Sequence, residues 1–264
     1  SLAWNLGNPF GAVADDPKPF IGMRELGAGG SGQFCLVDAD CLAGETCATT
    51  DIGRRFHPMK GPMTTQSLRG MAAAGPMHWR GDRTGGEDPG GDPLDEAAAF
   101  GKFNPAFTGL LGATSQLTAE QMQFYTDFIL SVAYPPNPIR QLDNQPTPSQ
   151  AAGEGLFKDE PTLGALPCND CHRAPLGTAG LAFPDAEPQD FKIPHLRNIY
   201  QKVGMFGVPL TINGFFEPTP FMGEQIRGFG LIHDGTAPNL QTFVSSNLFD
   251  LSPAAETQLT DFIK

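Results

Sequence analysis

The sequence contains no long apolar run and few basic residues, and each shortage excludes a class of protein. No stretch of roughly 18 apolar residues is present, so no segment can cross a bilayer as a helix. Lys and Arg together number 17 against 29 Asp and Glu, which gives a net charge of -12. A chain this acidic excludes a nucleic-acid partner, because phosphates require a basic surface.

The composition describes a loop-rich globular protein. Apolar residues reach only 40%, whereas the 32 Gly and 25 Pro exceed ordinary usage. A chain of 264 residues is long enough for one large or two small domains with apolar cores. The first residues, "SLAWNLGNPFG", lack the charged and apolar regions of a signal peptide. We therefore expect either that a signal has been removed or that this chain is a fragment.

Cysteine is also scarce, yet two of the five cysteines fall within one pentapeptide, "CNDCH" (168–172). This spacing is typical of haem c attachment, in which two thiols add to the porphyrin vinyl groups and the His ligates iron. We predict haem c on Cys168 and Cys171, with His172 as the proximal ligand. A redox-active dithiol and half of a zinc site are the alternatives. Haem is favoured because no strand leads into the motif and no second ligand pair follows it.

The other cysteines lie in "FCLVDADCLAGETC" and predict a disulfide-stapled loop. Cys35, Cys41 and Cys47 allow one bridge and leave one cysteine over, and the pairing stays open. A calcium site at Asp38 and Asp40 is a second choice to a solvated turn, because the Gly and distal Glu of an EF-type loop are missing. Covalent haem c is assembled outside the cytoplasm, and disulfides suit an oxidising compartment. We therefore expect a periplasmic or extracellular protein.

The chain repeats a helical pattern in its two halves. Residues 117–130 read "LTAEQMQFYTDFIL" and residues 251–264 read "LSPAAETQLTDFIK". Thr118 and Ser252 are predicted to be N-caps, each ahead of an amphipathic helix. The predicted apolar stripes are Met122, Tyr125 and Ile129 in the first helix, and Ala255, Leu259 and Ile263 in the second.

The order of features upstream of each helix strengthens the repeat. Both halves carry a Leu-Arg segment and then a His with a Gly-Asp or Asp-Gly turn, in "SLRGM…MHWRGDR" and "HLRNI…LIHDGT". We predict two tandem copies of one domain, at residues 1–145 and 146–264. The proline-rich strap 134–150 joins them, because proline is excluded from helix interiors. The predicted fold class is mainly α and loop-rich.

These motifs resemble those of a known family. "CNDCH", "KIPHLRNIY" and "HDGTAPNLQTF" resemble the C-terminal haem domain of bacterial di-haem cytochrome c peroxidases, and "TTQSLRG" with "MHWRGDR" resembles the N-terminal one. The resemblance covers most of residues 54–264. It implies the cytochrome c fold twice over. "FHPMKGPMTTQSLRG" and "YPPNPIRQLDN" look like a branch in which such a module belongs to large exported proteins, which implies assembly with upstream domains or other subunits.

The first half departs from the family, because it has no Cys-x-x-Cys-His motif. We therefore expect residues 1–145 to form a degenerate or partial cytochrome c-like domain with a Cys-containing loop. In the family, the first haem motif precedes a segment like "LAWNLGNP", which places it upstream of Ser1. A second haem attached there would find its ligand from this chain among His57, Met59, Met63 and His78.

The distal ligand of the iron decides the function, because Met or His closes the face that peroxide would need. Met205 is our first choice, since its flanking Gly residues permit close approach to a porphyrin. Met222 and His233 are the other candidates. The resemblance places His195 in a packing turn, as a satisfied core polar group, and His233 in a turn near the haem propionates.

We therefore predict an electron-transfer cytochrome module that exchanges single electrons with a redox partner protein, to which the net charge gives a preference for basic or neutral surfaces. The alternative is a di-haem peroxidase-like oxidoreductase whose first haem attachment segment lies outside this chain. A third possibility is that the first half is a haemless scaffold. No catalytic residue is assigned, because electron transfer is favoured over peroxidase activity.

Overall fold

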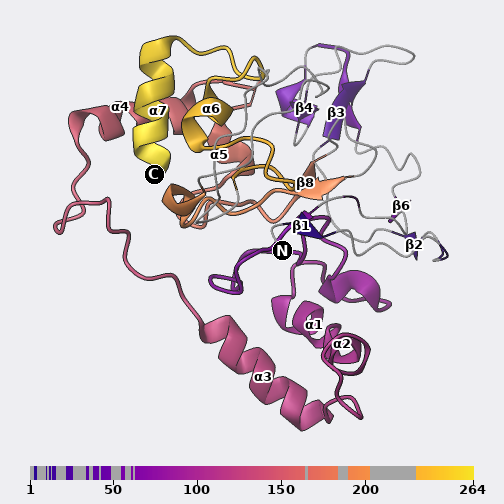
Figure 1. The fold of residues 1–264 in the computed structure, drawn as a ribbon. Helices are drawn as coiled ribbons and strands as arrows, with labels where there is room; N and C mark the ends of the chain where they lie inside the picture. The colour runs from indigo at the N-terminus through magenta and orange to yellow at the C-terminus, as the bar shows by residue number, and fades with distance from the viewer. Residues whose placement is uncertain are drawn as a thin grey trace.

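A computed structural model describes residues 63–163, 166–183, 190–202 and 230–264, together with short stretches before residue 62. Helices carry most of its regular structure, and long loops join them (Figure 1). The expected mainly α, loop-rich fold class is therefore confirmed for the described residues. The helices are α1 (Glu96–Gly101), α2 (Asn104–Gly109), α3 (Ala119–Ser131), α4 (Pro148–Asp159), α5 (Cys168–Cys171), α6 (Leu240–Val244) and α7 (Pro253–Ile263).

The strands are short and pair only with antiparallel neighbours. Three two-stranded sheets are β1–β7, β2–β6 and β8–β9, and one three-stranded sheet has the order β4-β3-β5. The strands are β1 (Ala3–Trp4), β2 (Ala14–Asp15), β3 (Gly22–Glu25), β4 (Phe34–Cys35), β5 (Thr46–Ala48), β6 (Arg55–Phe56), β7 (Met63–Thr64), β8 (Ala182–Phe183) and β9 (Phe191–Lys192).

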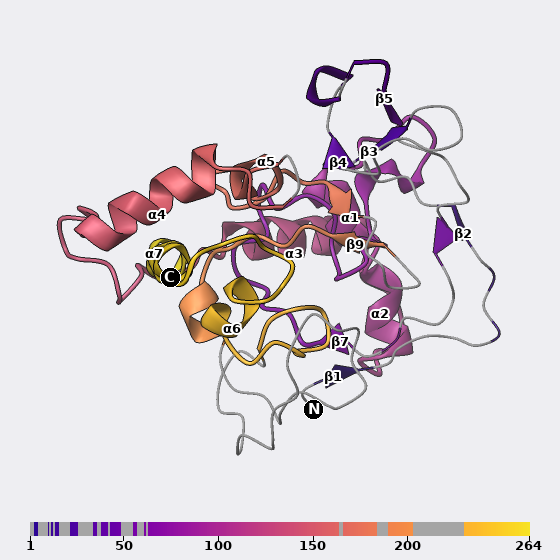
Figure 2. The same ribbon diagram turned by 90° about the horizontal axis from the view of Figure 1, so that it is seen from above.

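The second half is built around the contact of α4 with α7. These two helices lie against each other at an angle, as both views show (Figures 1 and 2). Gly153 permits the close approach, because a methyl group there would collide with the Gln258 carbonyl and lie 2.8 Å from Phe262 Cβ. The rings of Phe157 and Phe262 pack with centroids 5.3 Å apart. Leu259 is fully buried in the same core. This core therefore depends on one glycine facing one helix backbone.

The first half has a smaller core between α1 and α3. Met122 and Ile129 of α3 are buried against Ala99 and Phe100 of α1, as the helical stripe predicted. The prediction that Tyr125 is the third buried residue of this stripe is wrong, because its side chain is 41% exposed. The next residue, the polar Thr126, is buried instead of Tyr125. Its hydroxyl donates a hydrogen bond to the Met122 carbonyl at 2.8 Å, which satisfies it inside the core.

Both predicted N-caps are confirmed. Thr118 accepts a hydrogen bond from the Gln121 amide and forms a capping box, and Ser252 accepts one from the Ala255 amide. In α7, Leu259 is buried as predicted, while Ile263 packs partly buried against the same core. The shared "TDFI" letters thus begin with a buried threonine in both helices, Thr126 and Thr260.

The strap expected at 134–150 is shorter than predicted. The chain has no helix from 133 to 147, but α4 begins at Pro148, which occupies the first helical turn. The first turn of a helix tolerates proline, since that amide has no intrahelical acceptor in any case. Thr147 caps α4 by accepting from the Gln150 amide. Proline density alone therefore placed the end of the connector three residues too late.

The strands β4 and β5 of the cysteine loop both pair with β3, which gives the sheet order β4-β3-β5. Between β4 and β5 the described residues also form a 3-10 turn at Asp38–Asp40. Cys47 is disulfide-bonded, which agrees with a stapled loop, and Cys41 keeps its thiol. Asp38 accepts a hydrogen bond from the Cys47 amide at 2.8 Å. Within the described stretches, no three His, Cys, Asp or Glu side chains converge on a metal position.

Hydrogen bonds at Thr64 of β7 connect the first half of the chain to the second. The Thr64 amide donates to the His233 carbonyl at 2.6 Å, and the Thr64 carbonyl accepts from the Trp79 indole at 2.8 Å. The Trp79 carbonyl in turn accepts from the Lys192 amide at 2.9 Å. Gly75 and Gly180 also meet backbone to backbone. None of the helices in the described ranges is both long and apolar enough to span a membrane.

The two glycines of α4 offer a matched test of this packing. We expect Gly153→Ala to lower the free energy of unfolding by about 1–3 kcal/mol, because its methyl group overlaps the α7 backbone. Gly155→Ala meets no atom within 4 Å and should raise it by up to about 1 kcal/mol, the gain in helix propensity. Urea unfolding of both variants measures the difference, and equal stabilities would show that α4 and α7 are not in close contact.

Candidate functional site

The "CNDCH" motif forms a single helical turn on the main core. Cys168 and Cys171 begin and end α5, three residues apart, so both side chains lie on one side of the turn. Cys168 packs against the core of α4, α6 and α7, and its sulfur lies 3.2 Å from the Thr162 hydroxyl. The buried Leu166 and the N-cap Pro167 lead the chain into the turn.

His172 ends this turn with a fixed orientation. Its amide donates to the Cys168 carbonyl at 2.8 Å. Its ring Nδ1 lies 3.1 Å from both the Gly177 carbonyl and the Pro194 carbonyl. A carbonyl oxygen can only accept, so Nδ1 must carry the proton and Nε2 must carry the lone pair. The backbone therefore selects the tautomer that ligates a metal through Nε2.

A glycine brings these two carbonyls together. Gly177 has a left-handed φ of 80°, and a Cβ at this position would lie 2.7 Å from the Leu196 amide nitrogen. The loop after α5 can thus lie directly on the segment that contains Pro194. The sequence motif identified the histidine, but nothing in "CNDCH" indicates which carbonyls hold it.

The pKa values of the three motif side chains argue against the first alternative, a redox-active dithiol. Burial, with smaller effects of Asp170 and Cys168, raises the pKa of Cys171 to about 12, and burial raises the pKa of Cys168 as well. Burial lowers the pKa of His172, against the hydrogen bonds to Gly177 and Pro194. Both thiols are therefore protonated and the imidazole is neutral near pH 7. A redox-active dithiol requires a lowered thiol pKa, so this environment argues against one.

The second alternative, half of a zinc site, requires further ligands near the two thiols. No cluster of three metal-binding His, Cys, Asp or Glu side chains occurs among residues 63–163, 166–183, 190–202, 230–264 and the short described stretches. The donors that the described chain offers at this point are two thiols and one imidazole. This donor set matches the chemistry of haem c attachment.

His195 lies one residue after the Pro194 carbonyl and faces the first half. Its Nε2 is 3.4 Å from the Tyr134 hydroxyl, and the two rings meet edge to face. Its Nδ1 is buried with no hydrogen-bond partner, so the expectation of a satisfied core histidine holds for only one nitrogen. Burial, aided by the positive charges of Lys192, Arg197 and Lys202, lowers the pKa of His195 to about 4.

Lys192 was missed by the sequence analysis. It lies in β9, two residues before Pro194, whose carbonyl holds His172. Desolvation lowers the pKa of Lys192 to about 8 despite the charge of Asp82. Lys202 also has a lowered pKa because of burial. Both lysines keep partial exposure, and the pKa of each is lowered because desolvation disfavours the charged form. The pattern "FKIP" carries no signal that its lysine points inward.

His233, a candidate distal ligand, is buried. Its ring stacks on Phe191 with centroids 4.1 Å apart and an interplanar angle of 12°. Its backbone carbonyl holds Thr64, as described above. The other two candidates, Met205 and Met222, lie outside the described residues. Of the possible ligands to a second haem, His57 and Met59 also lie outside them, and Met63 is a half-buried residue of β7.

His78, the remaining candidate, is held in a similar manner to His172. Its Nδ1 lies 2.7 Å from the Asp82 carboxylate, which leaves Nε2 available, and its ring meets Phe103 edge to face at 4.7 Å. The carboxylate of Asp82 also receives a hydrogen bond from the buried Arg80 at 3.3 Å. A carboxylate on one ring nitrogen is a common arrangement behind a metal-binding histidine.

The turns around His78 and His233 have matching backbones. An antiparallel bridge joins Met77 to Arg83 in the first half and Leu231 to Ala237 in the second, with the same separation. In each loop, positive φ occurs at the residue after the first bridge partner and again three residues later. These residues are His78 and Gly81 in the first loop, and Ile232 and Gly235 in the second.

This match differs by one residue from an alignment that pairs the two histidines. The letters align His78 with His233, but the bridges and φ values align His78 with Ile232 and Trp79 with His233. The Leu-Arg segments also match, because the next residue is left-handed in both, at Gly70 and Asn198. Backbone conformation, which the letters only partly specify, therefore sets the register.

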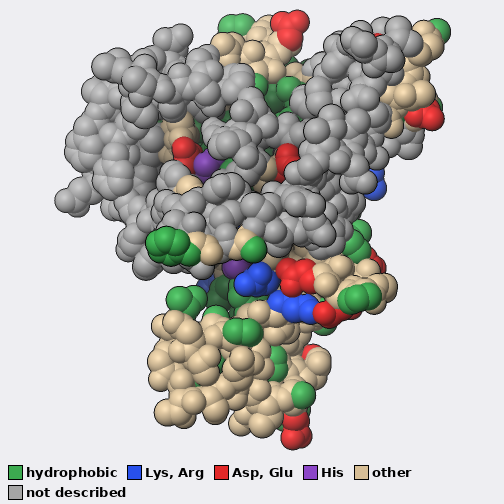
Figure 3. All heavy atoms as spheres, turned by 90° about the vertical axis from the view of Figure 1, so that its right-hand side faces the viewer, with side chains coloured by type: hydrophobic (Ala, Val, Ile, Leu, Met, Phe, Trp, Pro, Cys, Tyr) green, Lys and Arg blue, Asp and Glu red, His purple; other side chains and the backbone are tan. Residues whose placement is uncertain are grey.

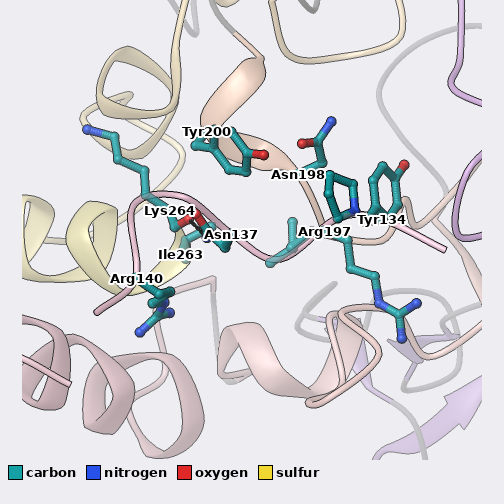
Figure 4. Close-up of a pocket in the computed structure, with 10 residues that line it drawn as sticks. Tyr134, Asn137, Arg140, Arg197, Asn198, Tyr200, Ile263 and Lys264 are labelled. Atoms are coloured by element: carbon teal, nitrogen blue, oxygen red, sulfur yellow. Dashed lines mark hydrogen bonds between the residues drawn. The ribbon is translucent and has the colours of Figure 1, made fainter. Parts of the chain in front are cut away.

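A cavity of about 210 Å³ lies beside the site, between the strap and the Leu-Arg segment of the second half (Figure 4). It contains none of the three motif side chains. Its lining residues come from the strap, from the segment 196–200 and from the end of α7: Tyr134, Pro135, Asn137, Arg140, Leu196, Arg197, Asn198, Tyr200, Ile263 and Lys264.

Comparison with known proteins reveals a likeness in fold. No family model matches the chain, and no curated protein sequence matches it. Among solved structures, hydrazine synthase of Kuenenia stuttgartiensis pressurised with 20 bar of xenon is similar, with a TM-score of 0.50. The match covers 86% of this chain and 83% of that chain at 14% identity, which shows similarity of fold alone.

The buried, neutral His195 predicts a specific dependence of stability on pH. Its folded pKa of about 4 lies below the ordinary value of 6.5, so the unfolded chain binds more protons between these values. Stability is therefore lost as the pH falls from 6.5 towards 4. We expect wild type to lose about 1–2 kcal/mol relative to His195→Phe between pH 7 and pH 5. Urea unfolding at both pH values measures this, and parallel losses would contradict the burial of a neutral imidazole.

Proposed function

We propose that this protein is a c-type cytochrome module that carries single electrons through haem c attached to Cys168 and Cys171. The observation that carries the proposal is the orientation of His172, whose Nδ1 is held 3.1 Å from two backbone carbonyls. That arrangement leaves Nε2 as the ligand atom, next to two thiols on one helical turn. A haem bound at these residues supplies one-electron transfer between ferric and ferrous iron.

The surrounding residues suit that role. The carbonyls of Gly177 and Pro194 orient the imidazole and increase its basicity, as hydrogen-bond acceptors do for metal-bound histidines. The core of α4, α6 and α7 excludes water from one side of α5. An apolar environment around a redox centre raises the cost of the more highly charged oxidation state, and so tunes the potential.

We also propose that the two halves, 1–145 and 146–264, are tandem cytochrome c-like domains. The matching bridges, left-handed residues and capped terminal helices support this division. The fold likeness to hydrazine synthase supports the fold and brings no substrate to this chain. Haem c chemistry and the disulfide at Cys47 support export, and the net charge of -12 supports a basic or neutral redox partner.

Covalent attachment predicts a modified peptide. The tryptic fragment that ends at Arg173 should carry the mass of one haem, joined through Cys168 and Cys171. Cys168→Ser should leave one thioether, and replacing both cysteines by Ser should release the haem on denaturation. Cys41→Ser is the matched control, because that thiol lies in the N-terminal sheet region. Mass spectrometry that finds both thiols unmodified in the exported protein would falsify the proposal.

The distal ligand predicts the spectrum. If Met205 ligates the iron, its thioether raises the potential relative to a second histidine and closes the face that peroxide needs. Met205→Ala should then keep the haem attached and convert a low-spin spectrum to a high-spin, cyanide-binding one. Met222→Ala should change little. A low-spin Met205→Ala protein, together with a high-spin His233 or Met222 variant, would identify another ligand.

The di-haem peroxidase-like oxidoreductase is the second candidate function, and one observation favours it. The Nδ1 of His78 is anchored by Asp82, which suits a second iron ligand supplied to a haem that is attached elsewhere. Pyridine haemochrome analysis of the full-length protein distinguishes the two functions by the number of haems. One low-spin haem per chain supports electron transfer, whereas two haems with one high-spin iron support the alternative.

A further inference from the structure

The contact of α7 with α4 serves as an internal template for the surface of α3. In α7, three residues meet α4: the Gln258 carbonyl faces Gly153, Asp261 accepts from the Ser149 hydroxyl at 2.7 Å, and Phe262 packs on Phe157. Counted from Gln258, the other two positions are three and four residues further on, so all three lie on one face of the helix. Their partners on α4 form the pattern Ser-x-x-x-Gly-x-x-x-Phe.

The equivalent face of α3 is not covered by any helix of the described chain. Aligning the "TDFI" letters places Phe124, Asp127 and Phe128 where α7 has Gln258, Asp261 and Phe262. Phe124 is 66% exposed and Phe128 is 61% exposed, and Asp127 is exposed as well. The opposite face of α3 is buried against α1, so this helix is folded and packed on one side only. Figure 1 shows it away from α4 and α7.

Exposure of large apolar side chains is confined to the first half and the strap. In the described part of the chain, no such side chain after Leu142 is exposed. The lobe of α1, α2 and α3 shows green surface patches in Figure 3, and blue and red side chains lie beside one another at its upper margin. Two phenylalanines one helical turn apart form a continuous apolar strip, which is costly to leave in water.

The charged residues of the segment that contains this strip, residues 103–139, are of one sign. Between Lys102 and Arg140 the charged residues are Glu120 and Asp127, both acidic. Glu120 lies one turn before Phe124 and Phe128 one turn after it, so a carboxylate and two aromatic rings follow one another along the face, with Asp127 beside Phe128. A complementary partner is apolar along its centre and basic at its edges.

We infer that the face of α3 formed by Glu120, Phe124, Asp127 and Phe128 docks a basic amphipathic helix of a partner protein, as α7 docks α4. The docking helix has a small residue over Phe124, a large apolar residue against Phe128 and Lys or Arg near the two carboxylates. The inference rests on the tandem repeat in the proposed function and is independent of the haem.

A peptide that copies α4 tests this directly. The probe is residues 147–159 with Glu154→Lys and Asp159→Lys, fluorescently labelled and crosslinked on its outward face, because so short a peptide is otherwise barely helical. We expect saturable binding to the full 264-residue chain, weakened by added salt. The same peptide with Gly153→Leu should bind at least about tenfold more weakly, because its side chain meets the α3 backbone.

Variants of the protein provide the matched comparison. Phe124→Ser with Phe128→Ser should weaken binding about tenfold or more, whereas Leu142→Ser, exposed but outside the face, should leave it unchanged. Equal binding by the double variant and wild type would overturn the inference. So would a self-associating chain that becomes monomeric in the double variant, since the occupant would then be a second copy. The haem content of each variant, read by pyridine haemochrome, shows separately whether the proposed function holds.

Discussion

One imidazole N–H, shared between two carbonyls, organises the candidate site. The Nδ1 of His172 ties the loop through Gly177 to the segment through Pro194, so α5 cannot move without both. That segment also contributes Lys192 to the first-half contact and His195 to Tyr134. The segment that orients His172 is therefore also the one that meets the first half, through the Lys192 amide and the His195 ring.

Much of this arrangement is readable from the sequence where local chemistry decides the structure. Thr118 and Ser252 were predicted as caps because a hydroxyl before an amphipathic stretch satisfies free helical amides. "CNDCH" predicts the candidate site residues because the spacing of two thiols and an imidazole is typical of haem c attachment. Helical periodicity predicted the two amphipathic helices, and the resemblance to the cytochrome family implied the mainly α fold. Tyr125 failed because a stripe of letters does not determine which of two adjacent residues turns inward.

The remaining features depend on contacts between distant segments. No pattern near Lys192 predicts its lowered pKa or the hydrogen bond from its amide to the Trp79 carbonyl, which joins segments more than 100 residues apart. The register between the two turns differs from the aligned histidines because left-handed residues at His78 and Ile232 set it. The two halves also use their terminal helices differently. The helix α7 packs closely on α4 at Gly153, whereas α3 packs on α1 with one face only.

The junction at Thr64 has a consequence for the order of folding. Its amide meets the His233 carbonyl across a loop of roughly 170 residues, and closing a loop of this length costs chain entropy without local contacts in return. The cores around α3 and around α7 use mostly closer segments and can form first. We therefore expect the halves to collapse separately and to dock late. With this order, the surroundings of α5 stay open until the halves dock, which would leave the two thiols accessible to the haem attachment proposed above.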